Sequence, residues 1–523
     1  MEAVHKTCDV LIVGSGLAGL SCAKYLSEFQ PDLRVTIITK SGIMESNTVF
    51  AQGGLACVNV HAGDAFENHI DDTMNAGGGV NNKRIVEMVV RNAPSAIEDL
   101  KRWGVRFDSK TSGEFDLALE GGHSVSRVVH CLDSTGKSVE QTLSDSVLEE
   151  SNVDVEEYVF AYEILTDANM TSAGNYEGVL AFDLIQKKWM IYKSQALILA
   201  TGGIGQVFAA STNSSVATGD AVSMANRAGA DIENMHWIQF HPTAISSRTG
   251  GRTFLISEAL RGAGAHLVNH AGKRFMLDVH PMAELAPRDI VSRAIMEEMQ
   301  INKVKNVFLD CRHMNASDLK NQFPSIYSYC LSTGFPPDTR LIPVAPSAHY
   351  SCGGIAVDYN GMTSIESIYA CGECSSTGLH GANRLASNSL TEAIVYAKIC
   401  AKRIVKSMDK KPLTETTYQL PEIDNSETQA TEIEDIKRDI QSLMTESAGP
   451  FRSNYGLSNA LTTLSKIEKK IREMRVTTGF STKLGELQNI CETAILVTQH
   501  AAIAKSNVGL HFNVDLEHSE MKK

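Results

Sequence analysis

The sequence lacks the features of nucleic-acid-binding, membrane-spanning and disulfide-rich secreted proteins. Its 523 residues contain 48 Lys and Arg against 61 Asp and Glu, a formal net charge of −13, so there is no positive excess to attract nucleic acid or an anionic membrane. The longest uncharged run, residues 194–219, holds several glycines and turns polar after residue 210, which excludes a membrane span. The 11 cysteines are scattered, so we expect a reducing compartment rather than a disulfide framework.

Two further absences bear on location and on metal chemistry. The chain does not begin with a basic region followed by an apolar one, so no secretory signal is expected. The segment CGEC, residues 371–374, is the only pair of cysteines at this spacing. It could be a redox or metal pair, or two ordinary thiols. Because a second pair and a nearby His cluster are both missing, the sequence favours ordinary thiols and predicts no metal site.

What the chain does have is material for a large core. It is 43% hydrophobic with only 13 prolines, and its length predicts two or three folded units. This composition is typical of a globular enzyme. Because the net charge is negative, an anionic substrate would have to be bound by locally clustered Arg and His side chains.

The strongest local motif is CDVLIVGSGLAGLSCAKYLSE, which starts at residue 8. An apolar strand at residues 10–13 precedes Gly14-x-Gly16-x-x-Gly19, and a helical pattern follows. Gly14 permits the tight turn, Gly16 lets a pyrophosphate approach the backbone, and Gly19 allows close helix packing. The helix N-terminus then offers N–H groups to the anion. The motif therefore predicts a dinucleotide site.

Lys40 ends a second predicted strand, at residues 34–40, where an acid would normally bind a ribose hydroxyl. One interpretation is that Lys40 selects the 2′-phosphate of a nicotinamide cofactor. The other is that it lies beside the pyrophosphate or in solvent. The motif alone leaves both open.

Two later stretches suggest that the dinucleotide domain is assembled from separated pieces. Residues 194–208, SQALILATGGIGQVF, form another apolar strand that ends in glycines. Residues 367–390 combine a short strand, a Gly-rich loop and the start of a helix. Both follow the pattern of strands that meet a bound cofactor at their carboxyl ends.

Six stretches resemble the flavoprotein family of succinate dehydrogenase, fumarate reductase and L-aspartate oxidase. They occur in the order of that family and cover most of residues 8–400. The stretches are ESNTVFAQGG (45–54), QFHPT (239–243), SEALRGAGA (257–265), APRD (286–289), AHYSCGG (348–354) and HGANRLASNSL (380–390). The resemblance implies an α/β fold with bound FAD.

Two positions indicate the branch of that family. Asn47 stands where the membrane-complex members carry the His that bonds covalently to the flavin, so noncovalent FAD is expected. In LALEGGHSVSR, residues 117–127, Glu120 before the two glycines and His123 after them resemble the L-aspartate oxidases, in which the acid orients the substrate ammonium. A dicarboxylate with an added cation needs an added anion in its site. Without the resemblance, Glu120 could equally be a solvated loop acid.

The resemblance also implies which residues bind substrate. Arg384 and His349 would clamp one carboxylate of L-aspartate, while His241, Ser257 and Glu258 would hold the other. The family more often has Thr where Ser257 stands. Arg288 resembles the proton donor and acceptor of succinate–fumarate interconversion. Because an arginine normally stays protonated, it would deliver a proton when fumarate is reduced and stabilise charge when the amino acid is oxidised.

The implied flavin contacts comprise the turn after the first strand, Lys40, the AQGG segment and four later residues. Ser15 to Ala18 would cradle the pyrophosphate, Lys40 the adenosine side, and residues 47–54 the isoalloxazine. In full they are Gly14, Ser15, Gly16, Leu17, Ala18, Gly19, Lys40, Asn47, Thr48, Val49, Phe50, Ala51, Gln52, Gly53, Gly54, Asp220, Glu373, Ser389 and Leu390. Two departures from the family are Ala221 after Asp220, and Arg127 as the single basic residue after GGHS.

We therefore expect an α/β protein with a discontinuous Rossmann-like FAD-binding domain at residues 1–235 and 345–408. An inserted α+β capping domain would span 236–344, and a C-terminal three-helix bundle 425–510. The apolar stripes of the three helices in this bundle would be Ile433, Ile436, Ile440 and Leu443; Leu457, Leu461, Leu464, Ile467 and Ile471; and Leu484, Leu487, Ile490 and Ala494.

The expected activity is oxidation of L-aspartate to iminoaspartate, the first step toward NAD by way of quinolinate, with O2 or fumarate as acceptor. Quinolinate synthase is a conceivable partner, and the family resemblance implies the cytoplasm, or a plastid if the source is a plant. The alternatives are a soluble fumarate reductase with noncovalent FAD, or a flavin-carrying electron-transfer subunit on an iron–sulfur partner.

Overall fold

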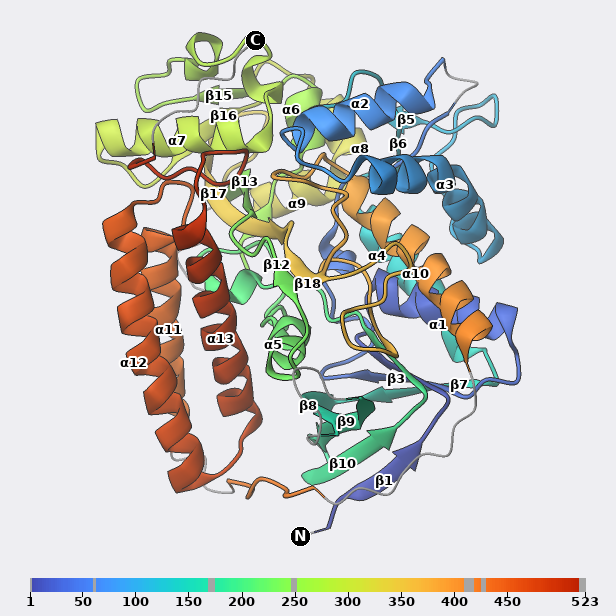
Figure 1. The fold of residues 1–523 in the computed structure, drawn as a ribbon. Coiled ribbons are helices and arrows are strands. Elements are labelled where there is room, and N and C mark those ends of the chain that lie inside the picture. The colour runs from blue at the N-terminus through green and yellow to red at the C-terminus, as the bar shows by residue number, and fades with distance from the viewer. Residues whose placement is uncertain are drawn as a thin grey trace.

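The computed structural model describes residues 2–59, 63–167, 175–245, 252–408, 418–424 and 429–516. A parallel sheet with helices along one face occupies the centre, a mixed α/β layer covers its carboxyl end, and three long helices stand alongside (Figure 1). The start predicted for the helical domain, residue 425, lies outside the described residues. No helix in the described ranges is both long enough and apolar enough to cross a bilayer.

The central sheet is built from pieces that are far apart in the sequence. Its five parallel strands run in the order β19 (Ile368–Ala370), β11 (Ala196–Leu199), β2 (Val10–Val13), β3 (Val35–Thr39) and β7 (Val153–Glu157). Four of them are strands expected from the sequence, within residues 10–13, 34–40, 194–208 and 367–390. The predicted discontinuous Rossmann-like fold is confirmed.

Alternation along β2 divides its side chains between two cores. Val10 and Ile12 pack with one set of helices, whereas Leu11 and Val13 face the opposite side. The first set comprises α1 (Leu17–Phe29), α3 (Lys83–Arg102), α4 (Thr135–Leu148) and α10 (Asn388–Ser407). On the other side lie α5 (Asp220–Arg227) and the sheet of β1 (Val4–Thr7), β10 (Lys188–Lys193), β9 (Tyr176–Asp183) and β8 (Val159–Thr166).

The layer above the carboxyl end of the parallel sheet has its own antiparallel sheet and core. The strand order is β14 (Phe254–Leu255), β13 (Ile238–Ile245), β17 (Ile342–Ser351), β16 (Val307–Asp310) and β15 (His266–Val268). Its helices are α6 (Glu258–Gly262), α7 (Arg288–Asn302), α8 (Ala316–Gln322) and α9 (Pro324–Ser332). The expected domain limit at residue 344 falls within β17, which continues to the cavity described below.

The C-terminal bundle consists of α11 (Ala430–Ser447), α12 (Asn454–Thr478) and α13 (Thr482–Ile503). Most of the predicted stripe residues are buried, but Leu443, Leu461 and Ile467 are only partly buried, and Met444 lies in the core instead of Leu443. The core position therefore moves by one residue near the end of α11. Helix α13 packs on α5, where Ser223 donates to the carbonyl of Asn489 at 3.0 Å.

Short elements complete the fold. They are α2 (Phe66–Ala76), a three-stranded sheet of β4 (Leu55–Ala56), β6 (Val128–Val129) and β5 (Leu117–Ala118), and another of β12 (Ile232–Glu233), β18 (Gly354–Ala356) and β20 (Ser375–Ser376). The described residues also form short 3-10 helices: η1 (Thr48–Phe50) and η3 (Gly205–Val207) near the cavity, and η4 (Phe275–Asp278) and η5 (Ala283–Leu285) in the upper layer.

Candidate active site

One large cavity lies between the parallel sheet and the layer above it. It contains about 1630 Å³ of space, part of it open to solvent. All the residues expected to bind cofactor or substrate line it except Gly19 and Val49. The sequence motifs, which extend from residue 14 to residue 390, therefore converge on one place.

The glycines of the first motif create a turn that side chains could not fit. Gly14 has φ +111°, and a Cβ there would lie 2.2 Å from the carbonyl oxygen of Ala200. A Cβ on Gly19 would lie 2.0 Å from the carbonyl oxygen of Gly14, so Gly19 supports the turn from behind rather than lining the cavity. The first turn of α1 is thereby left open to an anion.

Lys40 does not point into solvent. Its ammonium lies 2.9 Å from a carboxylate oxygen of Asp220 and 2.7 Å from one of Glu486, and it donates to Thr218 at 2.6 Å. Although burial lowers the pKa of Lys40, the charges of Asp220 and Glu486 raise it above its ordinary value. Because two carboxylates already balance this cation, the arrangement disfavours recognition of a nicotinamide 2′-phosphate.

Glu486 and its neighbour Asn489 are site residues that sequence reasoning missed. Both come from α13 of the bundle, and the Asn489 amide donates to Asp220 at 2.9 Å. They lie about one helical turn apart on a stripe that otherwise forms core. No local signal distinguishes them, because their role depends on how the bundle docks on α5.

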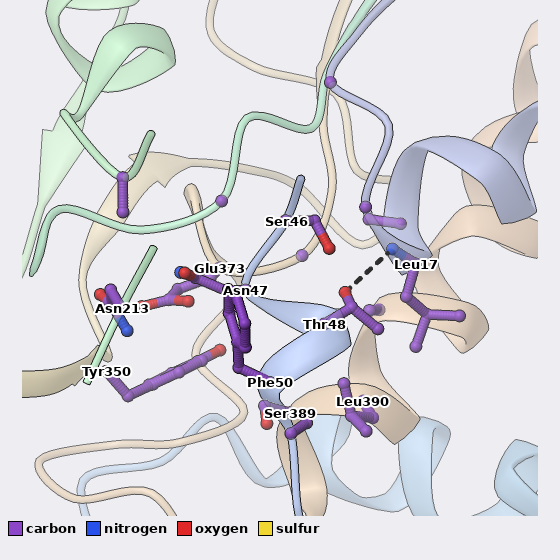
Figure 2. A pocket seen from close by; sticks show the side chains of 18 of the residues that line it. Leu17, Ser46, Asn47, Thr48, Phe50, Asn213, Tyr350, Glu373, Ser389 and Leu390 are labelled. Carbon is purple, nitrogen blue, oxygen red and sulfur yellow. Dashed lines mark hydrogen bonds between the residues drawn. The ribbon is translucent and has the colours of Figure 1, made fainter. Parts of the chain in front are cut away.

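Asn47 and Glu373 lie side by side in the cavity (Figure 2). The side-chain oxygen of Asn47 accepts from the backbone N–H of Ser214 at 2.8 Å, and Glu373 accepts from that of Ser351 at 3.1 Å. Burial raises the pKa of Glu373 to about 7. A Cβ on Gly203 would lie 2.2 Å from the Glu373 carboxylate, so this acid fits only beside glycine.

Two arginines and two histidines gather at the end of the cavity beneath the upper layer. The rings of His241 and His349 are 5.1 Å apart, and Arg384 lies 3.0 Å from Nε2 of His349. Burial, reinforced by the charges of Arg288 and Arg384, holds the pKa of both histidines well below the ordinary value. Both imidazoles are therefore neutral at pH 7.

The hydrogen-bond partners of each imidazole determine which of its ring nitrogens carries the proton. Nδ1 of His241 accepts from the backbone N–H of Thr243 at 3.2 Å, so its proton resides on Nε2. Nε2 of His349 accepts from Arg384, so its Nδ1 donates to Thr212 at 2.8 Å. His241 can thus donate into the cavity, whereas His349 supports Arg384 in this state.

Gln239, which the sequence motif contained but which we did not expect as a site residue, joins the two arginines. Its side-chain oxygen accepts from Arg288 at 2.9 Å and from two nitrogens of Arg384 at 3.2 Å each. Its amide nitrogen donates to Asn383 at 2.8 Å. A single buried amide therefore sets the spacing of two guanidinium groups that repel each other.

Glu258 differs from its expected role as a carboxylate contact. It accepts from Nε of Arg288 at 2.6 Å, with Arg261 3.4 Å away. Burial raises the pKa of Glu258, but Arg288 and Arg261 outweigh this and lower it. An ionised carboxylate repels a second one, so the contacts suit Glu258 to orient Arg288. Ser257 caps α6 and accepts from the N–H of Ala259 at 3.3 Å.

Glu120 is buried within the same cluster, with 4% of its surface exposed. It accepts from the hydroxyl of Ser387 at 2.5 Å. Burial, and then the charge of Glu258, raises the pKa of Glu120, while Arg288 and Arg384 oppose the rise. This placement argues against a solvated loop acid.

The loop that carries Glu120 is held by a buried chain of polar contacts. His123 donates from Nε2 to the carbonyl of Ala386 at 2.9 Å, and its Nδ1 accepts from Arg127, also at 2.9 Å. Arg127 also pairs with Asp64 at 2.9 Å and Asp72 at 2.5 Å. This single basic residue of the loop is therefore fully engaged and does not contact a substrate anion.

The arrangement suits a small dicarboxylate that also carries a positive charge. Arg384, Arg288 and the Nε2 proton of His241 are donors for carboxylates. Glu120 supplies an anion that two carboxylates alone would not need. The remaining length of the cavity, from Asn47 to the first turn of α1, fits a dinucleotide.

Comparison with known proteins agrees with this geometry. A family model described as FAD binding domain matches residues 9–390, and one described as fumarate reductase flavoprotein C-term matches 437–521. The chain is 39% identical over 518 residues to an L-aspartate oxidase of Yersinia pestis, covering 97% of this chain and 96% of that protein. It is 36% identical to a chloroplastic L-aspartate oxidase of Oryza sativa, covering 100% and 84%.

Solved structures are similar over nearly the whole chain. A quinol fumarate reductase from E. coli superposes with a TM-score of 0.87 at 28% identity, covering 99% of this chain and 92% of that one. Sdh1 of Mycobacterium smegmatis gives 0.80 at 28% identity, covering 98% and 90%. The similarity therefore extends through the parallel sheet, the upper layer and the bundle.

Proposed function

Because this chain belongs to the FAD-dependent L-aspartate oxidase family, we propose that its cavity oxidises L-aspartate to iminoaspartate in the first step of NAD biosynthesis by way of quinolinate. The Cα–H bond breaks, and the hydrogen leaves with the electron pair of the bond as hydride. The nitrogen loses a proton and a C=N bond forms. Bound FAD supplies the hydride acceptor for this reaction.

The residues present fit noncovalent FAD. The open first turn of α1 and the glycines beside it suit the pyrophosphate, and Asn47 offers no nucleophile for a covalent flavin bond. Glu373 suits a ribose or ribitol hydroxyl, and the N-terminus of α10 at Ser389 and Leu390 suits the pyrimidine edge of the flavin.

Each substrate group then has a partner of the right chemistry. Arg384, positioned by His349 and Gln239, binds one carboxylate, and His241 with Ser257 binds the other. Glu120 pairs with the ammonium, and its raised pKa suits it to accept the nitrogen proton that must leave. Arg288 stabilises carboxylate charge during aspartate oxidation and would deliver a proton if fumarate were reduced.

The observation that carries this proposal is the burial of Glu120 beside the arginine pair. The likeness to fumarate reductases supports fumarate as an electron acceptor, with O2 as the alternative. We further propose that the enzyme acts in the cytoplasm, or in a plastid in plants, and that quinolinate synthase receives its reactive product.

The test is anaerobic reduction of the purified flavoprotein, followed by the loss of flavin absorbance. We expect L-aspartate to bleach the flavin and succinate to leave it oxidised. In Glu120→Gln, bleaching by L-aspartate should slow by about 30-fold or more, because losing one partner of a buried charge pair costs about 2–5 kcal/mol. Bleaching by succinate alone would instead indicate a fumarate reductase, and bleaching by neither an electron-transfer subunit.

A further inference from the structure

Glu140 is a buried acid that neither cofactor nor substrate binding, as described above, uses. It lies on α4, four residues after Gly136, so both face the same side of the helix. A Cβ on Gly136 would lie 1.8 Å from the carbonyl oxygen of Thr48. Helix α4 therefore presses on η1, and Glu140 lies on the same side one turn further along.

The surroundings of Glu140 disfavour its charged form. Its side chain is fully buried, and among the described residues neither carboxyl oxygen has a partner in full hydrogen-bond geometry, although the Ser46 and Thr48 hydroxyls lie beside the carboxyl. Burial raises the pKa of Glu140 to about 8, and the hydroxyls of Ser46 and Thr48 only partly oppose this rise. Within the described parts of η1, α1 and β7, no charged side chain contributes to the shift.

The two hydroxyls connect Glu140 to the cofactor cavity. Ser46 and Thr48 both line it, and the Thr48 hydroxyl accepts from the backbone N–H of Leu17 at 3.1 Å. Figure 2 shows this bond at the first turn of α1, with Ser46 beside it. An anion bound at that turn would lie close to the Thr48 hydroxyl, and Glu140 lies beside the same two hydroxyls.

We propose that Glu140 is a protonated positioning residue for the FAD pyrophosphate, and that its ionisation weakens FAD binding. The neutral carboxyl shares its proton with the hydroxyl of Ser46 or Thr48 and leaves the site positive enough for a diphosphate. The ionised carboxylate adds a negative charge beside the same hydroxyls, close to the two charges of the diphosphate. The protein interior screens the resulting repulsion poorly. This inference rests on the proposed function, because it requires FAD in the cavity.

The direction of the pH effect follows from linkage. Bound diphosphate disfavours the carboxylate, so the pKa of Glu140 is higher with FAD than without it, and binding takes up a proton. The contribution of Glu140 to FAD affinity is then constant below its pKa in the free protein and falls as pH rises through that pKa, whereas Glu373, whose pKa is about 7, titrates at lower pH. For one proton and a free-protein pKa of about 8, affinity decreases about tenfold between pH 7 and pH 9.

The experiment measures the FAD dissociation constant by flavin fluorescence from pH 6.5 to 9.5. Glu140→Gln keeps the shape and a donor but cannot ionise. We expect it to bind FAD within about threefold of the wild type at pH 7 and to lose the decline above pH 8. Glu149→Gln, at the exposed end of the same helix, should keep the wild-type profile. A decline in Glu140→Gln equal to that of the wild type would overturn the inference.

Wild-type protein provides an independent measurement if the variant fails to fold. Calorimetric titration with FAD at pH 8.5, in two buffers of different ionisation enthalpy, gives the protons taken up. We expect more than half a proton at pH 8.5 and close to none at pH 6.5. No uptake at pH 8.5 would refute the role of Glu140, whereas no FAD binding at any pH would refute the proposed function itself.

Discussion

The two ends of the cavity are built from different material. At the cofactor end, glycines and backbone N–H groups form a surface that fits because side chains are missing, as at Gly14 and Gly19. At the substrate end, buried ionisable side chains compensate one another, as Arg288 does with Glu258. The first end depends on local shape and the second on long-range balance of charge, so we expect them to fail in different ways.

The largest effect should follow from filling the cofactor end. Gly14→Ala places a Cβ 2.2 Å from the Ala200 carbonyl oxygen, which requires the strand and the turn to move apart. We expect loss of bound FAD and a markedly lower melting temperature. Gly264→Ala is the matched control, because its φ is +114° but it has no atom within 4 Å of the new Cβ.

The control separates the effect of backbone strain from the effect of the steric overlap with Ala200. Gly264→Ala should cost about 1–3 kcal/mol of stability from its φ alone and keep FAD. The flavin absorbance per protein and thermal unfolding measure both variants. Equal FAD loss in the two would show that strain, rather than the close approach to Ala200, controls the cofactor end.

Changing the charge balance should spare the cofactor. Arg384→Lys keeps the charge but removes the planar fork that contacts Gln239 and His349. Each hydrogen bond to a charged group contributes about 1.5–3 kcal/mol, and the contacts to both Gln239 and His349 are lost, so kcat/KM for L-aspartate should fall at least 100-fold with FAD retained. Arg312→Lys, which changes an exposed ion pair with Asp310 in the upper layer, is the control. Loss of FAD in Arg384→Lys would show that the cofactor end and the substrate end of the cavity are not independent.

The same contrast explains what the sequence could predict. The strand at residues 10–13 and the three glycines are contiguous, so their geometry follows from local rules. Likewise, the stripes of α11, α12 and α13 follow from helical periodicity. The motif QFHPT contained Gln239, but its place between Arg288 and Arg384 requires three segments to meet, and no local pattern encodes that.

The differences have physical causes of the same kind. Glu258 was grouped with carboxylate-binding residues because of the family resemblance, yet the charges of Arg288 and Arg261 outweigh its burial and keep it ionised. At Lys40, the sequence left two interpretations open because its partner Glu486 lies 446 residues away. In both cases the missing information is the charge that arrives from another element.

A pH profile should sharpen the description of the substrate end. Only ionised Glu120 attracts the substrate ammonium, and its pKa is raised above the ordinary value of 4.5. As pH falls through this raised pKa, kcat/KM for L-aspartate should decrease toward tenfold per pH unit. Glu120→Gln should have lower activity without that acid limb. An unchanged acid limb in the variant would assign it to another group.

The smallest effect should come from the bundle, which reaches the cofactor end through Glu486 and Asn489. Glu486→Gln removes one of two carboxylates from Lys40 but leaves Asp220 2.9 Å away. Because Glu486 is partly exposed, with 29% of its side chain accessible, its contribution should be about 0.5–1 kcal/mol. FAD affinity should therefore fall about two- to fivefold, with KM for L-aspartate unchanged. Arg438→Gln, which removes an exposed ion pair with Asp435 on α11, should alter neither FAD affinity nor KM. A larger loss for Glu486→Gln, together with a new affinity for 2′-phosphorylated adenosine, would mean that this carboxylate is what restrains the cation at Lys40 from binding phosphate.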